Sequence, residues 1–118
     1  MFANLAKLVA ASVADKLVEL PKSIITFVNS NTSSVAGSAL YNAGTVDMTG
    51  VEFDSNSTTN NSNAGAVYNS GIMSITNSLF KSNTSANNGG AVYNEGTITV
   101  TNTDFVSNVS TGLGGALY

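Results

Sequence analysis

A repeated pattern of residues constrains this chain more than any other feature of its sequence. The pattern Ala-Val/Leu-Tyr-Asn-X-Gly occurs at residues 39–44, 66–71 and 91–96, and its first three residues recur at 116–118. Each complete copy is followed by a Phe-X-X-Asn segment, at residues 53–56, 80–83 and 105–108. A period of a few tens of residues is typical of a solenoid, in which each copy forms one turn of a coil.

The spacing of the copies separates a constant framework from a variable loop. The tyrosines lie at positions 41, 68, 93 and 118, so successive steps are 27, 25 and 25 residues. From each tyrosine to the next phenylalanine, the distance is always 12 residues. Length changes are therefore confined to the segment rich in Asn, Ser, Thr and Gly that follows each Phe-X-X-Asn. We expect turns of about 25 residues with one loop per turn that varies freely.

The composition excludes several classes of function. Only 9% of the residues are charged, fewer than an ordinary globular domain carries, and 11 glycines suit tight turns between short strands. Four Lys, no Arg and a net charge of −3 do not favour a nucleic acid partner, because phosphate neutralisation needs clustered basic residues. Cysteine and histidine are absent, so disulfides and soft metal ligands are excluded, and we predict no cofactor and no metal site.

The first residues differ from the repeats. Apolar side chains between residues 2 and 20 recur at spacings of three and four, which predicts an amphipathic α-helix that Pro21 ends. Four charges interrupt the segment, so a transmembrane span is not expected. A signal peptide is an alternative that lacks a basic start. We favour a helix that caps the coil, giving a capping segment at residues 1–22 and parallel β-helix repeats at 23–118.

Alternation within each repeat predicts which side chains point inward. After each Asn-X-Gly turn comes a strand whose expected core pairs are Val46 and Met48, Met73 and Ile75, and Ile98 and Val100. A residue that tolerates left-handed backbone follows at Gly50, Asn77 and Asn102, where we place a bend. In the Ala-Val/Leu-Tyr strand, we expect the aliphatic residue inside and the tyrosine hydroxyl in water.

Parallel pairing of successive turns stacks equivalent residues about 4.8 Å apart. Residues 24–36 read as a partial repeat, in which Phe27 stands 26 residues before Phe53. The predicted core ladder therefore consists of two columns, Phe27, Phe53, Phe80 and Phe105, and Asn56, Asn83 and Asn108. The asparagine amides can donate and accept from turn to turn.

The two motifs together resemble the repeat of the chlamydial polymorphic membrane proteins and similar adhesin-like surface proteins. That repeat combines a Gly-Gly-Ala-Ile/Val/Leu-Tyr/Phe box with a Phe-X-X-Asn box. Here, the first box is Gly89–Tyr93 and Gly114–Tyr118, with looser versions at 64–68 and 37–41. The second is Phe53–Asn56, Phe80–Asn83 and Phe105–Asn108, whereas Phe27–Ser30 departs from it. The resemblance covers residues 24–118 and implies a right-handed parallel β-helix, display outside the cell, adhesion and no catalytic residue.

The residues themselves offer little chemistry. Glu52 and Asp104 share an outward column, but Leu79 stands between them, so they cannot form a close acidic dyad. Outward threonines allow an ice-binding interpretation, which Asp47 and Ile72 interrupt. Five Asn-X-Ser/Thr sequons begin at Asn31, Asn56, Asn60, Asn83 and Asn108, and we expect those in the Phe-X-X-Asn boxes to belong to the ladder.

The sequence therefore predicts an all-β protein: a right-handed parallel β-helix with an N-terminal capping α-helix. The predicted function is that of an extracellular structural or adhesive module without enzymatic activity. Expected partners are further copies stacked head to tail into filaments, or the continuation of a longer surface protein, with a host-cell or glycan ligand. An alternative is a carbohydrate-binding or carbohydrate-active domain. The predicted binding face contains Tyr41, Tyr68, Tyr93, Tyr118, Thr45, Thr97, Thr99 and Thr101.

Overall fold

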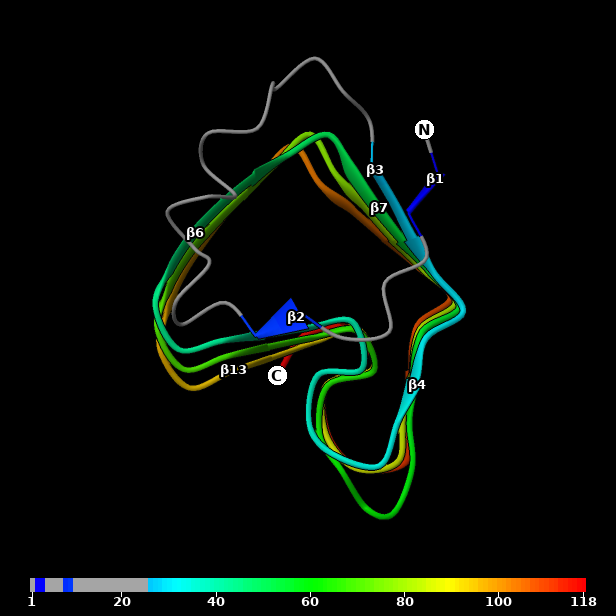
Figure 1. The fold of residues 1–118 in the computed structure, drawn as a ribbon. Coiled ribbons are helices and arrows are strands. Elements are labelled where there is room, and N and C mark those ends of the chain that lie inside the picture. Colours follow the sequence, from blue (N-terminus) through cyan, green and yellow to red (C-terminus); the bar gives the residue numbers. More distant parts are fainter. Residues whose placement is uncertain (1, 4–7, 10–25) are drawn as a thin grey trace.

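The protein is a coil of short parallel strands. In the computed structural model, residues 2–3, 8–9 and 26–118 are described, and this part of the chain contains strands and turns without a helix. Seen along the coil axis, successive turns superimpose, with straight sides and one loop that projects from the coil (Figure 1). The predicted all-β parallel solenoid is confirmed, with about three turns between β5 and β16.

Four sheets run along the coil, and each takes one strand from every turn. The first contains β1 (Phe2–Ala3), β3 (Thr26–Asn29), β7 (Val51–Asp54), β11 (Leu79–Lys81) and β15 (Asp104–Val106). The second contains β6 (Thr45–Thr49), β10 (Ile72–Thr76) and β14 (Thr97–Thr101). The third contains β4 (Thr32–Ser33), β8 (Ser57–Thr58), β12 (Thr84–Ser85) and β16 (Val109–Ser110). The fourth contains β2 (Leu8–Val9), β5 (Leu40–Asn42), β9 (Val67–Asn69) and β13 (Val92–Asn94).

Two dipeptides near the N-terminus extend these sheets. Strand β1 pairs in parallel with β3, and β2 pairs in parallel with β5. Both dipeptides fall within the segment 2–20 for which the sequence predicts a capping helix. The remainder of that segment, and the predicted boundary between residues 22 and 23, lie outside the described residues.

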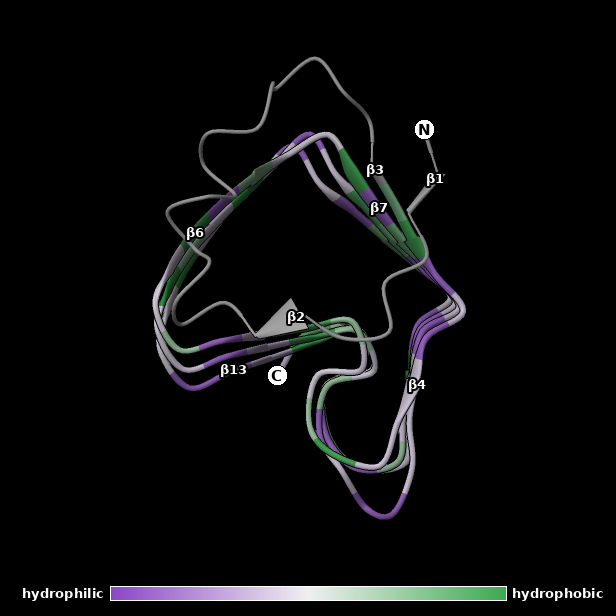
Figure 2. Ribbon diagram, viewed as in Figure 1, coloured by the Kyte–Doolittle hydropathy of each residue, from purple (hydrophilic) through white to green (hydrophobic). Residues whose placement is uncertain are grey.

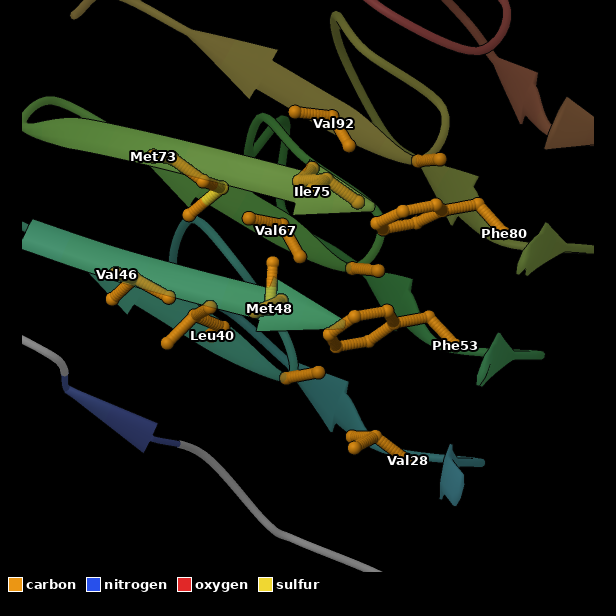
Figure 3. Packing of buried hydrophobic residues seen from close by; sticks show 13 residues of the cluster. Val28, Leu40, Val46, Met48, Phe53, Val67, Met73, Ile75, Phe80 and Val92 are labelled. Carbon is orange, nitrogen blue, oxygen red and sulfur yellow. The ribbon is translucent and has the colours of Figure 1, made fainter. Parts of the chain in front are cut away.

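The interior of the coil is apolar and is built by alternation along the strands. Val46 and Met73 are each 1% exposed and lie in register, as do Met48 and Ile75. From the facing sheet, Leu40, Val67 and Val92 also point inward and are almost completely buried. Figure 3 shows these side chains meeting between the sheets. Hydropathy follows the same division, since the strands carry the hydrophobic residues and the corners are largely hydrophilic (Figure 2).

A column of aromatic rings lines one side of this core. The rings of Phe53 and Phe80 stack with centroids 4.8 Å apart, and those of Phe80 and Phe105 with centroids 5.0 Å apart. The prediction that Phe27 continues this column is wrong. Phe27 is in register with Glu52, whereas Val28 pairs with Phe53 and is 4% exposed. Figure 3 shows Val28 below Phe53.

The shift has a simple geometric cause. Side chains alternate across a strand, so a displacement of one residue moves a side chain to the opposite face. Val28 stands 25 residues before Phe53, which is the usual length of one turn, whereas Phe27 stands 26 residues before it. Counting from Val28 also brings Asn31 into the asparagine position, so that segment 28–31 is the first copy of the second box.

This assignment of inward and outward positions predicts unequal effects of two aliphatic truncations. We expect Val28→Ala to lower the free energy of unfolding by about 2 kcal/mol, because it leaves a cavity under Phe53. The control is Ile72→Ala, at an outward position that is 57% exposed, where the expected change is within about 0.5 kcal/mol. Urea denaturation of both variants measures the difference. Equal effects would contradict the register.

The corners of the coil depend on left-handed backbone. Gly50, Asn77 and Asn102 have φ values of 67°, 51° and 46°, as expected for the bend after the long strand. A second left-handed corner was not expected from the sequence. It lies at the serine before each box asparagine, Ser30, Ser55, Ser82 and Ser107, with φ between 54° and 58°. The chain thus turns sharply on both sides of each phenylalanine strand, which directs the asparagine side chain into the coil.

Candidate functional site

The box asparagines form a continuous ladder of amides through one corner. The Asn56 backbone N–H and its Nδ2 group both donate to Asn83 Oδ1, each at 3.0 Å. The Asn83 backbone N–H and Nδ2 donate in the same way to Asn108 Oδ1, at 3.0 and 2.9 Å. The second hydrogen of Asn83 Nδ2 is donated to the Phe53 carbonyl at 2.9 Å. Because Asn56 and Asn83 are fully buried, this ladder is a device that joins turns and cannot contact a ligand.

A second ladder of asparagines was not predicted. Asn42 Nδ2 donates to Asn69 Oδ1, and Asn69 Nδ2 donates to Asn94 Oδ1, both at 2.6 Å. Asn42 and Asn69 are fully buried, and their Oδ1 atoms accept hydrogen bonds from the Gly44 and Gly71 N–H groups of their own Asn-X-Gly turns. Asn42 Nδ2 also donates to the Ile72 carbonyl in the next turn of the coil. The signal was present in the sequence, since the Asn of Asn-X-Gly is as regular as the Asn of Phe-X-X-Asn. Sequence alone indicates only a turn residue at this position.

Burial decides which of the five sequons could accept a sugar. Asn31, Asn56 and Asn83 are at most 5% exposed, and their amides are hydrogen-bonded within the first ladder. Asn108 is partly buried and also belongs to that ladder. Asn60 is exposed, in the loop between β8 and β9, which projects further than its equivalents (Figure 1). Of the five, Asn60 is therefore the sequon that is open to modification.

The outer face of β6, β10 and β14 presents mostly small polar side chains, together with the exposed Ile72 between Thr45 and Thr97. The three strands are in register over five residues each, so outward side chains form straight columns. One column consists of Thr49, Thr76 and Thr101. In the next, the Ser74 hydroxyl donates to Asp47 at 2.8 Å, and Thr99 continues the column. The four threonines predicted as binding residues all lie on this face and are exposed: Thr45, Thr97, Thr99 and Thr101.

The tyrosines form a separate column on the sheet of β5, β9 and β13. Centroids of successive rings lie 4.8 Å apart for Tyr41 and Tyr68, 5.3 Å for Tyr68 and Tyr93, and 5.2 Å for Tyr93 and Tyr118. The rings are nearly parallel, with interplanar angles between 10° and 16°. Stacking covers the faces of the inner rings, so these offer edges and hydroxyls to a ligand. A sugar ring that packs on an aromatic face would find no such face along the middle of the column.

Glu95 joins two members of the tyrosine column. The hydroxyls of Tyr68 and Tyr93 donate to the two carboxylate oxygens of Glu95, at 2.5 and 3.2 Å. Desolvation and this hydrogen bond raise the pKa of both tyrosines above the ordinary value near 10. Both phenols therefore stay protonated at neutral and mildly alkaline pH.

Acidic residues are dispersed over the outer surface. Glu52, Leu79 and Asp104 are in register, so the two carboxylates lie two turns apart with an aliphatic side chain between them. Lys81 Nζ lies 3.5 Å from the Asp54 carboxylate. Within the described residues, no three acidic, histidine or cysteine side chains are grouped closely enough to hold a metal ion. A hollow of about 200 Å³ beside Glu52 is smaller than the ~300–1,000 Å³ of typical small-molecule sites.

The in-register columns and parallel sheets place the chain among β-solenoid repeat proteins. Residues 77–95 match the Chlamydia polymorphic membrane protein repeat, so the chain contains a repeat of this type. The match runs from the corner before Phe80, through the Asn83 rung of the ladder, to Tyr93 and Glu95. The resemblance drawn from the two boxes is confirmed. No match was found among curated proteins or among solved structures. A search for membrane-crossing helices finds none over the residues that the structure describes.

Proposed function

We propose that this chain is a non-enzymatic adhesive module displayed on a cell surface. The observation that carries the proposal is the flat outer face of β6, β10 and β14, where small hydroxyl side chains repeat at the spacing of one turn. Such a face can bind an extended partner through many weak, equivalent contacts. The repeat match at residues 77–95 supports the same class of function. The coil is expected to be right-handed, as crossovers between parallel strands almost always are.

The low charge of this face favours a partner that is recognised by shape and hydrogen bonds. On this face, Asp47 is the charged member of the columns, and its carboxylate accepts a hydrogen bond from Ser74. A nearly neutral surface lacks the long-range attraction that steers charged ligands. Binding would therefore depend weakly on salt. A glycan or a polar protein surface fits these properties better than a nucleic acid does.

The test measures binding of the purified chain to fixed mammalian epithelial cells. We expect saturable binding that is lost when Thr97, Thr99 and Thr101 are replaced together by lysine, since this change covers the end of the face with charge. Lysine at Thr32, Thr59 and Thr111, exposed positions outside β6, β10 and β14, is the matched control and should bind normally. Periodate treatment of the cells separates glycan ligands from protein ligands. Absence of saturable binding by the parent chain would contradict the proposal.

We also propose that the last turn stacks against a second copy of the chain. Six of the eight exposed large hydrophobic side chains of the described residues lie in this turn: Val100, Val106, Val109, Leu113, Leu117 and Tyr118. Strands β14, β15 and β16 are edge strands of their sheets, and exposed edges of this kind template pairing. Sedimentation velocity at several concentrations tests head-to-tail stacking. A sedimentation coefficient that rises with concentration is expected, and a constant monomer value would contradict self-assembly.

A further inference from the structure

One carboxylate, that of Glu95, lies beside the tyrosine column, although the stacking of the tyrosine rings does not require it. Strands β9 and β13 bring Tyr68 and Tyr93 into register, and Glu95 accepts a hydrogen bond from each hydroxyl. The positions equivalent to Glu95 in the other turns are Ser70 and Ala43, so the carboxylate is a feature of this turn alone. Glu95 is exposed and can exchange protons with water. The pair Tyr68 and Tyr93 therefore has a base at hydrogen-bond distance that the repeat itself does not supply.

A base in this position changes the oxidation chemistry of a phenol. When a phenol loses an electron, its O–H proton becomes strongly acidic, and a hydrogen-bonded carboxylate can accept that proton as the electron leaves. Burial and the bond to Glu95 raise the pKa of Tyr68, so oxidation through a preformed phenolate is disfavoured at neutral pH. Transfer of the proton to Glu95 as the electron leaves has the lower activation barrier, because a positioned base lowers the barrier of a proton transfer.

The geometry also holds the two rings for coupling. Their centroids are 5.3 Å apart, and their planes differ by 10°. Two groups held next to each other on one sheet meet more often than groups on separate molecules, and coupling then requires the stacked side chains to rotate until two ring carbons touch. We propose that Tyr68 and Tyr93 form an oxidative cross-linking site, which a haem peroxidase with hydrogen peroxide converts to dityrosine while Glu95 receives the phenolic protons.

The reaction starts from two phenols and ends with two phenols joined by a carbon–carbon bond. Each tyrosine gives up one electron to the peroxidase and its hydroxyl proton to Glu95, which passes it to water, leaving two tyrosyl radicals. A carbon–carbon bond forms between one ring carbon of each tyrosine, in both cases the carbon ortho to the phenolic oxygen. The hydrogens on those two carbons leave as protons, and the oxygens are reprotonated, which restores both phenols. The net loss of two protons and two electrons reduces one hydrogen peroxide to two waters.

The sequence makes the product easy to recognise. Lys81 is the only lysine after residue 22, and no arginine occurs, so trypsin separates Tyr41 and Tyr68 from Tyr93 and Tyr118. The dilute parent chain, treated with the peroxidase and hydrogen peroxide, should stay monomeric and develop dityrosine fluorescence. Its two tryptic peptides should remain joined, with two hydrogens fewer than their sum. Fragmentation should place the link between Tyr68 and Tyr93.

Three variants decide the roles of the groups. Tyr68→Phe keeps a ring in the stack and should abolish the joined peptide, whereas Tyr41→Phe, the matched control, should leave it unchanged. Glu95→Gln keeps a hydrogen-bond acceptor without a base and should slow dityrosine formation at least about a hundredfold, the lower end of the loss expected for a positioned base. Separate peptides from the oxidised monomer, a link through other tyrosines, or an unchanged rate for Glu95→Gln would overturn the proposal.

Discussion

Gly90→Ala should destabilise the coil by about 3 kcal/mol or more, the largest effect that we expect from adding a single methyl group. A Cβ atom at Gly90 would lie only 1.8 Å from the Gly115 carbonyl oxygen and 2.8 Å from backbone atoms of Val109. These are backbone atoms of the next turn, which cannot move aside as a flexible side chain can. The turns would have to separate and lose hydrogen bonds, a mechanism that gives unusually large effects. Thermal and urea denaturation measure the loss.

The chain provides a matched control for this substitution. Gly115 occupies the same repeat position one turn later, and there a Cβ atom would find its nearest neighbour, Asn108 O, at 3.7 Å. Gly115→Ala should therefore change the free energy of unfolding by no more than about 0.5 kcal/mol. In the first turn the position is Ser38, whose hydroxyl donates to the Gly65 carbonyl. Equal effects at Gly90 and Gly115 would contradict the close stacking.

Asn83→Asp should lower the free energy of unfolding by more than about 3 kcal/mol at pH 7. The substitution replaces the Nδ2 group, which donates to Phe53 O and Asn108 Oδ1, by an oxygen that faces both acceptors. The site is fully buried, so the introduced charge would have neither water nor a cation beside it. Asn102→Asp is the control, because Asn102 and its partner Asn77 are exposed and can rearrange. Its effect should be within about 0.5 kcal/mol.

This second prediction has a definite pH dependence. Burial among acceptors raises the pKa of the introduced carboxyl in the folded state above the ~3.9 of an unfolded chain. The folded variant thus binds more protons than the unfolded variant, and its stability falls as the pH rises above about 4. Relative to the parent chain, the deficit should be smallest near pH 3, where the carboxyl can donate one hydrogen bond. A deficit that shrinks as the pH rises would contradict burial of the ladder.

Much of the architecture could be predicted because a stacked fold repeats its constraints. Every turn must present the same residue to the turn above it, so Phe53, Phe80 and Phe105 reveal the register directly. Periodicity alone did not orient the Ala-Val/Leu-Tyr strand, because both of its alternate positions are apolar; the structure buries Leu40, Val67 and Val92 and leaves the tyrosines on the other side. The parallel pairing, the inward strand positions and the corner at Gly50 followed from the same reasoning.

The errors occurred where residue type and register disagree. Phe27 resembles its successors in type, but its register places it opposite Glu52, and the smaller Val28 fills the core. At Asn42 and Asn69, sequence predicts only the local Asn-X-Gly turn, because asparagine suits that turn equally well whether or not its amide also bonds to the next turn of the coil. The left-handed backbone at the serines could not be predicted, because serine rarely adopts this conformation without support from its surroundings.

The candidate site was less predictable than the fold. Alternation with the core predicted the outward threonine columns, whereas the outward facing of the tyrosines was expected only because their hydroxyls favour water. The sequence did not reveal that the rings of Tyr68 and Tyr93 cover one another, or that Glu95 reaches both hydroxyls. Those contacts join residues of neighbouring turns, and they depend on side-chain rotation that no periodicity specifies. Packing of a sugar ring on the inner tyrosines is disfavoured, because the stacked rings do not present their faces.

Disulfide trapping tests the central claim, in-register stacking of parallel turns, most directly, since the chain has no cysteine of its own. Thr76 and Thr101 are partners on the outer face, so Thr76→Cys with Thr101→Cys should form an intramolecular disulfide under mild oxidation. Thr76→Cys with Thr99→Cys is displaced by two residues on the same face, and at ~7–8 Å it should not. Rapid closure of the first pair alone is the predicted result. Closure of the displaced pair, or of neither, would contradict the stacked coil.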